Sequence, residues 1–405
     1  MRMIGLRCTF AMFFLLLACP GWGAEVSGRS STQALWYTSY YNDHRQLDLA
    51  QYLRLGINKI DQSGKFAIYG YGRGTQELIN GDELNGRLYY LYGEYRDLYD
   101  KLDIRIGRQF VNLSADTAII DGAEVVLKNV GPVGFSVIGG RDVVFGIDGE
   151  IGHEGDYALG VAAFLAGFRK TDLDVSWFRK WDQGDVSRDI IGATFKQYLL
   201  DRVKAYGNAR YDITSEVFNE LLGGMKYFPN EKLVFTGEYY ESYPTFDATS
   251  IFSVFAVNKY WEAVFRTSYT LNDMMELHAG YNRQEYGDDG EADVVEAGFN
   301  VRPIDPVLVT VTYDHRNGYP GKLDGGILEV MWDPTRQLQL AAGMNVDAYT
   351  REGFHDNREG RISQKYWLGA RYRIENMSLS VRVDDDINEE RSSYVKGRVV
   401  FNYDF

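Results

Sequence analysis

Apolar and polar residues alternate along most of this chain, most clearly in its last stretch. Val399, Phe401, Tyr403 and Phe405 are apolar, and mainly polar residues lie between them. A period of two places successive side chains on opposite faces of a β-strand. The chain is therefore predicted to end in a strand with one apolar and one largely polar face.

The same alternation recurs in many segments of about ten residues. In one of them, Leu102, Ile104 and Ile106 alternate with Asp103 and Arg105, and further segments begin at Leu47, Met275, Val307, Tyr366 and Met377. A tilted strand needs about this length to cross a bilayer. Strands of soluble proteins average only about five or six residues.

The connections between these segments differ in length. Short turns rich in Pro, Asn and Asp are predicted at residues 200–202, 229–231, 272–273, 303–306, 333–335 and 375–376. Longer polar loops are predicted at residues 241–258, 284–292, 314–324, 347–363 and 384–393. Short turns on one rim and long loops on the other are typical of outer-membrane barrels.

The closing strand resembles that of bacterial outer-membrane β-barrel porins, whose assembly machinery recognises a terminal aromatic residue with apolar residues at alternate positions before it. Phe405, Tyr403 and Phe401 match this pattern. The resemblance implies an all-β fold, a transmembrane antiparallel up-and-down β-barrel in the outer membrane, inserted by the barrel-assembly machinery. We count about 22 strands, with a range of 18 to 22, beginning near residue 34. Residues 144–152 and 213–228 are the weakest segments in this count.

The amino-terminus is predicted to be a signal peptide, residues 1–23, followed by the barrel, residues 24–405. Arg2 and Arg7 precede an apolar run at residues 9–19, and small residues follow it. Lipidation at Cys19 is an alternative. About ten residues would then precede the first strand, so no plug domain is expected. The wide lumen must hold water, inward-folded loops or another protein.

Composition excludes several functions. Removal of the leader moves the formal charge from −14 to −16, because it takes away two arginines, and this argues against nucleic acid as a partner. Both cysteines, Cys8 and Cys19, leave with the leader. The five histidines are scattered, and no nucleophile elbow or phosphate-binding loop is present. We expect no enzyme activity, no cofactor and no metal site.

One stretch offers candidates for a constriction. Arg105-Ile-Gly-Arg-Gln109, followed by Asp121-Gly122, is similar to a feature of alginate-export-type barrels. The resemblance implies that residues 110–119 fold into the lumen beside Arg108 and Gln109. The alternative is a plain rim in which Arg108 pairs with Asp116 or Asp121. Further pore candidates follow from strand phase: Arg54, Arg105, Arg371 and Arg373.

These features predict a porin-type channel for passive passage of small hydrophilic solutes or ions, with outer-membrane lipid around it. Arg105 and Arg108 are expected to set its ion selectivity. One alternative is a barrel sheath of a porin–cytochrome electron conduit, with a periplasmic multihaem cytochrome as partner. A second alternative is an export channel for an anionic polysaccharide.

Overall fold

The computed structural model describes residues 23–39, 43–81, 84–146, 149–245, 258–351, 361–389 and 391–405. Of the predicted signal peptide, residues 1–22 lie outside the described residues, and so does the alternative lipidation site Cys19. No helix in the described part is long and apolar enough to cross a membrane.

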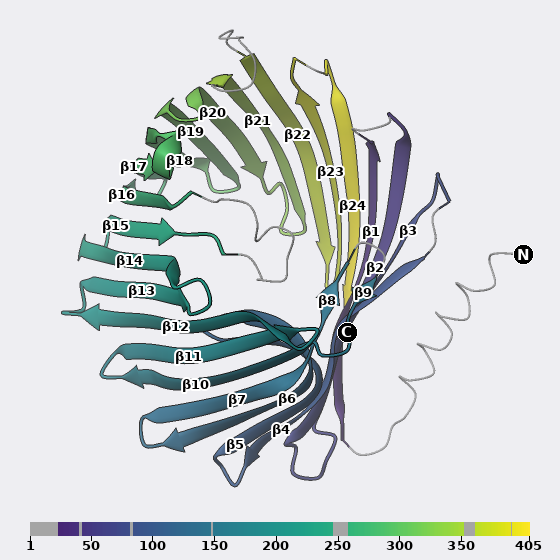
Figure 1. The fold of residues 1–405 in the computed structure, drawn as a ribbon. Coiled ribbons are helices and arrows are strands. Elements are labelled where there is room, and N and C mark those ends of the chain that lie inside the picture. The colour runs from purple at the N-terminus through teal and green to yellow at the C-terminus, as the bar shows by residue number, and fades with distance from the viewer. Residues whose placement is uncertain are drawn as a thin grey trace, which may run out of the picture.

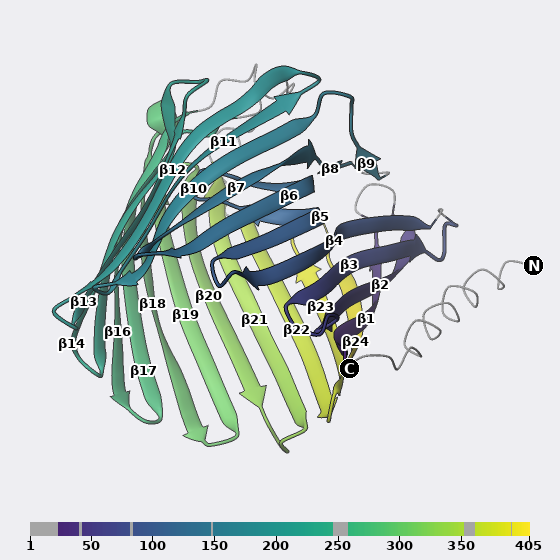
Figure 2. The same ribbon diagram turned by 90° about the horizontal axis from the view of Figure 1, so that it is seen from below.

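Twenty-two strands form one closed antiparallel sheet, in which each strand pairs with its neighbours in sequence (Figures 1 and 2). The first half comprises β1 (Glu25–Thr38), β2 (Arg45–Asn58), β3 (Phe66–Glu77), β4 (Asn85–Leu98), β5 (Leu102–Asn112), β6 (Thr117–Val130), β7 (Val133–Asp142), β10 (Tyr157–Phe168), β11 (Thr171–Asp182), β12 (Asp185–Leu199) and β13 (Val203–Asp212). The second half comprises β14 (Val217–Asn230), β15 (Leu233–Ser242), β16 (Tyr260–Asn272), β17 (Met275–Glu285), β18 (Glu291–Ile304), β19 (Val307–Gly318), β20 (Gly321–Trp332), β21 (Leu338–Arg351), β22 (Arg361–Ile374), β23 (Met377–Ile387) and β24 (Tyr394–Asp404). The prediction of an up-and-down barrel of about 22 strands is confirmed.

Two short strands stand outside this wall. β8 (Val144–Phe145) and β9 (Glu150–Ile151) pair only with each other, so β7 pairs directly with β10. The weak segment at residues 144–152 is therefore not a wall strand, whereas the segment at residues 213–228 contributes most of β14. A short 3-10 helix, η2 (Gly287–Asp289), lies in the connection between β17 and β18.

The first strand begins earlier than predicted, at Glu25 rather than near residue 34. Its outward positions carry Ser30 and Thr32, which interrupt the apolar alternation. Gln51 of β2 satisfies both hydroxyls: Thr32 donates to its amide oxygen at 2.6 Å, and its amide nitrogen donates to Ser30 at 2.9 Å. Only residues 23 and 24 of the described chain precede β1, not about ten.

One predicted long loop is also wrong. Residues 314–324 are mostly strand, because β19 continues to Gly318 and β20 begins at Gly321. Polar residues at these strand ends pair in register, for example His315 with Asp324. Polarity alone therefore did not distinguish a loop from a strand that continues beyond its apolar section.

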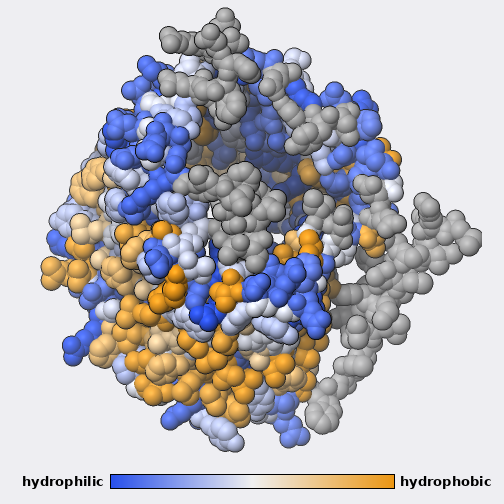
Figure 3. All heavy atoms as spheres, viewed as in Figure 1, coloured by the Kyte–Doolittle hydropathy of each residue, from blue (hydrophilic) through white to orange (hydrophobic). Residues whose placement is uncertain are grey.

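The two faces of the wall differ in chemistry. Ile106 and Leu368 are 64% and 66% exposed on the outer face, whereas Glu94 on the inner face is 2% exposed. Figure 3 shows hydrophobic residues over the lower part of the surface, where Figure 1 places β4–β7 and β10, and a hydrophilic hollow above. The alternation predicted from sequence thus separates an apolar exterior from a polar lumen.

The closing seam joins the two ends of the described chain. β24 pairs with β1, and Gly28 and Phe405 exchange two backbone hydrogen bonds of 2.8 and 3.1 Å. The Phe405 ring lies over Gly28, where an added Cβ would come within 2.5 Å of it. Phe405 also stacks on Tyr403 at 5.9 Å. Tyr403 and Phe401 are 37% and 40% exposed on the outer face.

The face assignment predicts a large difference between neighbouring positions of β23. Val381 is on the outer face and Ser380 on the inner face, where its hydroxyl is directed to the Val400 carbonyl. Val381→Arg should lower the free energy of unfolding in a bilayer by about 2–4 kcal/mol, and Ser380→Arg by much less. Denaturant titration of vesicle-refolded protein measures this, and equal losses would contradict the assignment.

The seam predicts separable effects of two changes. Deletion of Phe405 should impair outer-membrane insertion, because it removes the terminal aromatic residue and two backbone hydrogen bonds. Gly28→Ala keeps that residue but crowds its ring. It should therefore allow insertion and lower only the melting temperature of the barrel. Heat-modifiable mobility in outer-membrane fractions reports insertion, and normal insertion without Phe405 would refute its role as an assembly signal.

Candidate functional site

The tip of the β5–β6 hairpin, residues 113–116, lies against the inner face of β11 and β12, which follow β7 and β10 in the wall. Ser114 Oγ is 2.7 Å from Ser176 Oγ of β11 and donates to the Gly192 carbonyl of β12 at 3.1 Å. The Ala115 amide donates to Ser176 Oγ at 2.7 Å. Ser176 and Gly192 pair in register, so one transverse row of the wall receives the tip.

Two arginines of β12 and β13 also bind the tip. Arg210 of β13 donates to the Ser114 carbonyl at 3.0 Å, and Arg188 of β12 pairs with Asp116 at 2.9 Å. Arg188 also donates to the carbonyl of Thr245, at the start of the β15–β16 connection. Segments from two loops thus meet at Arg188 on the inner wall.

An apolar cluster fills the contact between hairpin and wall. The hairpin supplies Val111, Leu113, Ala115 and Ile120, and the wall supplies Ile138, Ala158, Ala162, Phe178 and Ile190. Burying a Val, Leu or Ile side chain contributes about 1.5–3 kcal/mol. The free energy gained by burying these side chains is therefore several times the thermal energy, which keeps the tip docked.

A row of glycines lies where the hairpin leaves β4. Gly107, Gly122 and Gly140 are successive partners across β5, β6 and β7. Gly107 has φ +126, and an added Cβ at Gly122 or Gly140 would clash with the facing backbone. Pairing of β5 with β4 ends one residue later, at Arg108. Glycine at these positions permits the close backbone approach that turns the hairpin inward.

The β8–β9 hairpin forms a second inward contact. Its Gly146 carbonyl accepts a hydrogen bond from Arg87 of β4, and Phe145 packs edge-on against Tyr89 at 5.8 Å. Glu150 pairs with Arg108 at 2.9 Å. The two inward hairpins are therefore joined to each other by an ion pair.

The structure brings together the candidates of the Gly-Arg-Gln stretch. Arg108 makes a bidentate pair with Asp121, with both distances 2.7 Å. Arg105 pairs with Glu94 at 2.7 Å and with Glu124 at 2.9 Å. Gln109 is 1% exposed and faces the wall. Both sequence interpretations thus describe part of the structure, because Arg108 pairs with Asp121 within a hairpin that lies inside the barrel.

Three other candidates lie elsewhere on the inner face. Arg54 is in β2 and pairs in register with Tyr71, while Arg371 and Arg373 are near the short-turn end of β22. Within the described part of the chain, none of the three makes an ion pair or side-chain hydrogen bond. Sequence reasoning missed Arg73 of β3, which also has no ion pair or side-chain hydrogen bond within the described part of the chain. It also missed the serine pair Ser114–Ser176 that anchors the tip.

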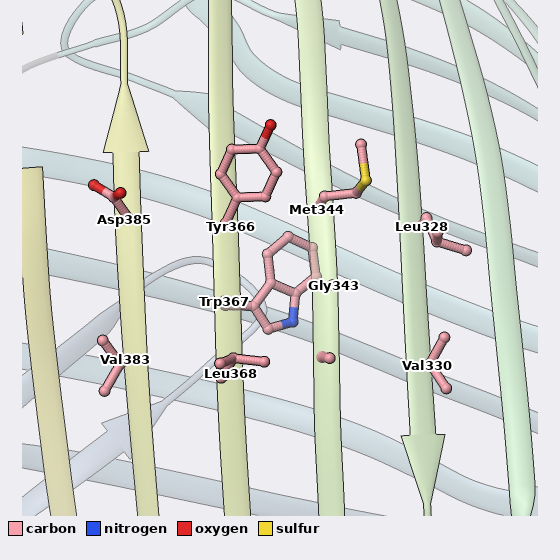
Figure 4. Close-up of a pocket in the computed structure, with 10 residues that line it drawn as sticks. Leu328, Val330, Gly343, Met344, Tyr366, Trp367, Leu368, Val383 and Asp385 are labelled. Atoms are coloured by element: carbon pink, nitrogen blue, oxygen red, sulfur yellow. The ribbon is translucent and has the colours of Figure 1, made fainter. Parts of the chain in front are cut away.

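A groove on the outer face is not a binding site. A shallow groove lined by Leu328, Val330, Tyr366, Leu368 and Val383 is formed on β20–β23 (Figure 4), and these side chains belong to the outer face. It is part of the apolar exterior.

His153, Asp156 and Asp182 have ligand atoms within 4.8 Å of one another. The Asp156 carboxylate already accepts the amides of His153 and Gln183, which lowers its pKa although burial raises it. This carboxylate orders two loop segments and needs no ion to explain its position.

No protein-family model and no curated protein matches the sequence. The structure is similar to the P pilus usher (PapC) translocation pore, with a TM-score of 0.52 and 9% identity, over 94% of this chain and 99% of that one. It is also similar to OccAB2 of Acinetobacter baumannii, with a TM-score of 0.50 and 11% identity, over 95% and 98%. A BenF-like porin from Pseudomonas fluorescens Pf-5 gives 0.50 and 9%, over 95% and 100%. These likenesses confirm the predicted porin-type barrel fold.

The docked tip predicts the effect of one methyl group. A Cβ at Gly192 would clash with the backbone of Ser114 and Ala115, so Gly192→Ala should displace the tip and raise single-channel conductance. Gly223→Ala is the matched control, because nothing lies within 4 Å of its Cβ position. Planar-bilayer recordings measure both variants, and unchanged conductance in Gly192→Ala would show that the tip does not narrow the lumen.

Proposed function

We propose that this protein is an outer-membrane channel of porin type, through which small hydrophilic solutes or ions pass passively. The observation that carries the proposal is the closed wall around a polar lumen. Among the described residues, the segments that reach inward are the β5–β6 tip, the β8–β9 hairpin and the start of the β15–β16 connection. All are short, and none is a separate domain.

The exterior supports placement in a membrane. Exposed apolar side chains recur at alternate positions of successive wall strands, for example Phe135 and Val137, Leu159 and Val161. A soluble protein rarely exposes an apolar surface this continuous. The predicted signal peptide supports export of the chain, and its cleavage remains a prediction.

The charge on the inner face of β2 and β3 supports a local attraction for anions. Arg105 and Arg108 each face two carboxylates, so the charge they present to a passing ion is largely compensated. Arg54 and Arg73 have no carboxylate within ion-pair distance among the described residues. A fixed uncompensated charge acts on ions at close range, where salt screens it least.

The fold alone does not determine the cargo, since one similar barrel is a pilus translocation pore and another a porin. The electron-conduit alternative needs a lumen wide enough for a cytochrome, and the two docked hairpins reduce that width. Purification of the native complex distinguishes these readings, because haem absorbance would accompany a cytochrome.

The decisive experiment is reconstitution of the pure protein in planar bilayers. We expect stepwise, ion-conducting openings without any added partner. A protein that is folded and inserted but gives no steps would contradict the channel proposal.

Selectivity should depend on the uncompensated arginines. We expect Arg54→Gln with Arg73→Gln to move the reversal potential toward cations. Lys101→Gln with Lys232→Gln makes the same charge change in turns on the rim, at side chains that have no ion pair among the described residues. This control should shift the potential less, because bulk salt screens rim charges within about 8–10 Å. Equal shifts would place the selective region elsewhere.

A further inference from the structure

The inner face of β2, β3 and β4 carries a continuous row of phenol rings, here called the tyrosine row. Its members are Tyr52, Tyr69, Tyr71, Tyr89, Tyr90 and Tyr92. Neighbouring ring centroids are 5.0–6.4 Å apart, from Tyr52 through Tyr71 to Tyr89 and from Tyr71 through Tyr90 and Tyr92 to Tyr69. All six side chains are partly exposed to the lumen. Phe145 of β8 extends the row at Tyr89.

Two phenols elsewhere on the inner wall are held by carboxylates, whereas most hydroxyls of this row are not. Tyr206 donates to Glu238, and Tyr260 donates to Glu262 at 2.6 Å. In the row, Tyr69 donates to Asn58 at 2.7 Å. The other five hydroxyls have no protein partner in the described part of the chain. A buried tyrosine hydroxyl usually has a hydrogen-bond partner. These five side chains are partly exposed, so their hydroxyls are available to a ligand.

β3 places its side-chain volume on the lumen side. Tyr69, Tyr71 and Arg73 face inward, while Gly70 and Gly72 occupy the outer face. Leucines of β4 cover the outward glycines: Leu91 lies 3.4 Å from the Cβ position of Gly70. An ordinary membrane strand carries its apolar bulk outward. The inverted distribution in β3 argues that the inward rings serve the lumen rather than the membrane anchor.

Two uncompensated cations lie within the row. Arg54 is the register partner of Tyr71, and Arg73 is the register partner of Tyr52. The Arg73 Nε is buried without a hydrogen-bond partner. The nearby carboxylate of Glu94 is already engaged by Arg96 and Arg105. The row therefore combines flat apolar faces, free hydroxyls and a local excess of positive charge.

We infer that the tyrosine row binds an oligosaccharide with acidic groups as it passes through the lumen. Pyranose rings present apolar C–H faces to aromatic rings and hydroxyls to phenols, and guanidinium groups bind carboxylates or sulfates. A single-ring aromatic acid would use one or two rings, whereas this row offers six in contact. The inference rests on the proposed channel function and specifies its substrate class.

Block of single-channel current by added oligosaccharides tests the inference. The probes are hexagalacturonate, maltohexaose and benzoate. We expect hexagalacturonate to block at the lowest concentration, maltohexaose more weakly, and benzoate not at all. Tyr71→Ala with Tyr90→Ala should weaken the hexagalacturonate block about tenfold, which corresponds to losing about 1.4 kcal/mol of stacking.

Further variants separate rings, hydroxyls and charge. Tyr71→Phe with Tyr90→Phe keeps the rings and should lose less affinity than the alanine pair. Arg54→Gln with Arg73→Gln should remove the preference for hexagalacturonate over maltohexaose. Tyr206→Ala is the control, since that phenol is held by Glu238 outside the row, and it should leave the block unchanged.

The outcomes distinguish this inference from the channel proposal. Absence of conductance from folded wild-type protein would overturn both. Normal conductance with no block by either oligosaccharide, or a block that the alanine pair leaves unchanged, would overturn the inference alone. If benzoate blocks as strongly as hexagalacturonate, the row binds single-ring acids and the inferred oligosaccharide is wrong. If maltohexaose blocks equally well, the requirement for acidic groups is wrong.

Discussion

Docking of the β5–β6 tip on the inner wall is the interaction on which the character of the lumen depends. It buries an apolar cluster and the Ser114–Ser176 pair inside the barrel, against the inner face of its wall. It also turns Arg108 and Asp121 toward the interior, where Glu150 of the second hairpin pairs with Arg108. A buried charge is costly unless it is paired. The two carboxylates therefore stabilise Arg108 in the inward-folded hairpin.

The same docking divides the lumenal charges into two classes. Arginines at the inward hairpins are held by carboxylates, while Arg54 and Arg73 on β2 and β3 are not. β8–β9 connects the two regions, since its Phe145 reaches the tyrosine row and its Glu150 reaches Arg108. Beyond the docked hairpins, the inner wall therefore carries aromatic rings and uncompensated cations.

Much of the fold could be predicted from sequence because the period of two reports burial directly. The pattern located most wall strands, and the resemblance to alginate-export-type barrels indicated the inward Gly-Arg-Gln stretch. It failed for β1, where Gln51 satisfies outward hydroxyls, and for residues 314–324, where polar strands continue in register. It could not find the tyrosine row or the serine anchor, because these depend on contacts between strands. The segment Tyr69-Gly-Tyr-Gly-Arg73 indicated part of the row, since large side chains alternate with glycine along it.

A disulfide trap tests the docked tip most directly. Ser114 and Ser176 have hydroxyl oxygens 2.7 Å apart although 62 residues separate them. Ser114→Cys with Ser176→Cys should form a disulfide under mild oxidation in intact membranes, visible as a shift in gel mobility that a reductant reverses. Ser114→Cys with Ser380→Cys on distant β23 should remain reduced. If the first pair also stays reduced in folded barrels, the tip does not lie on the inner wall.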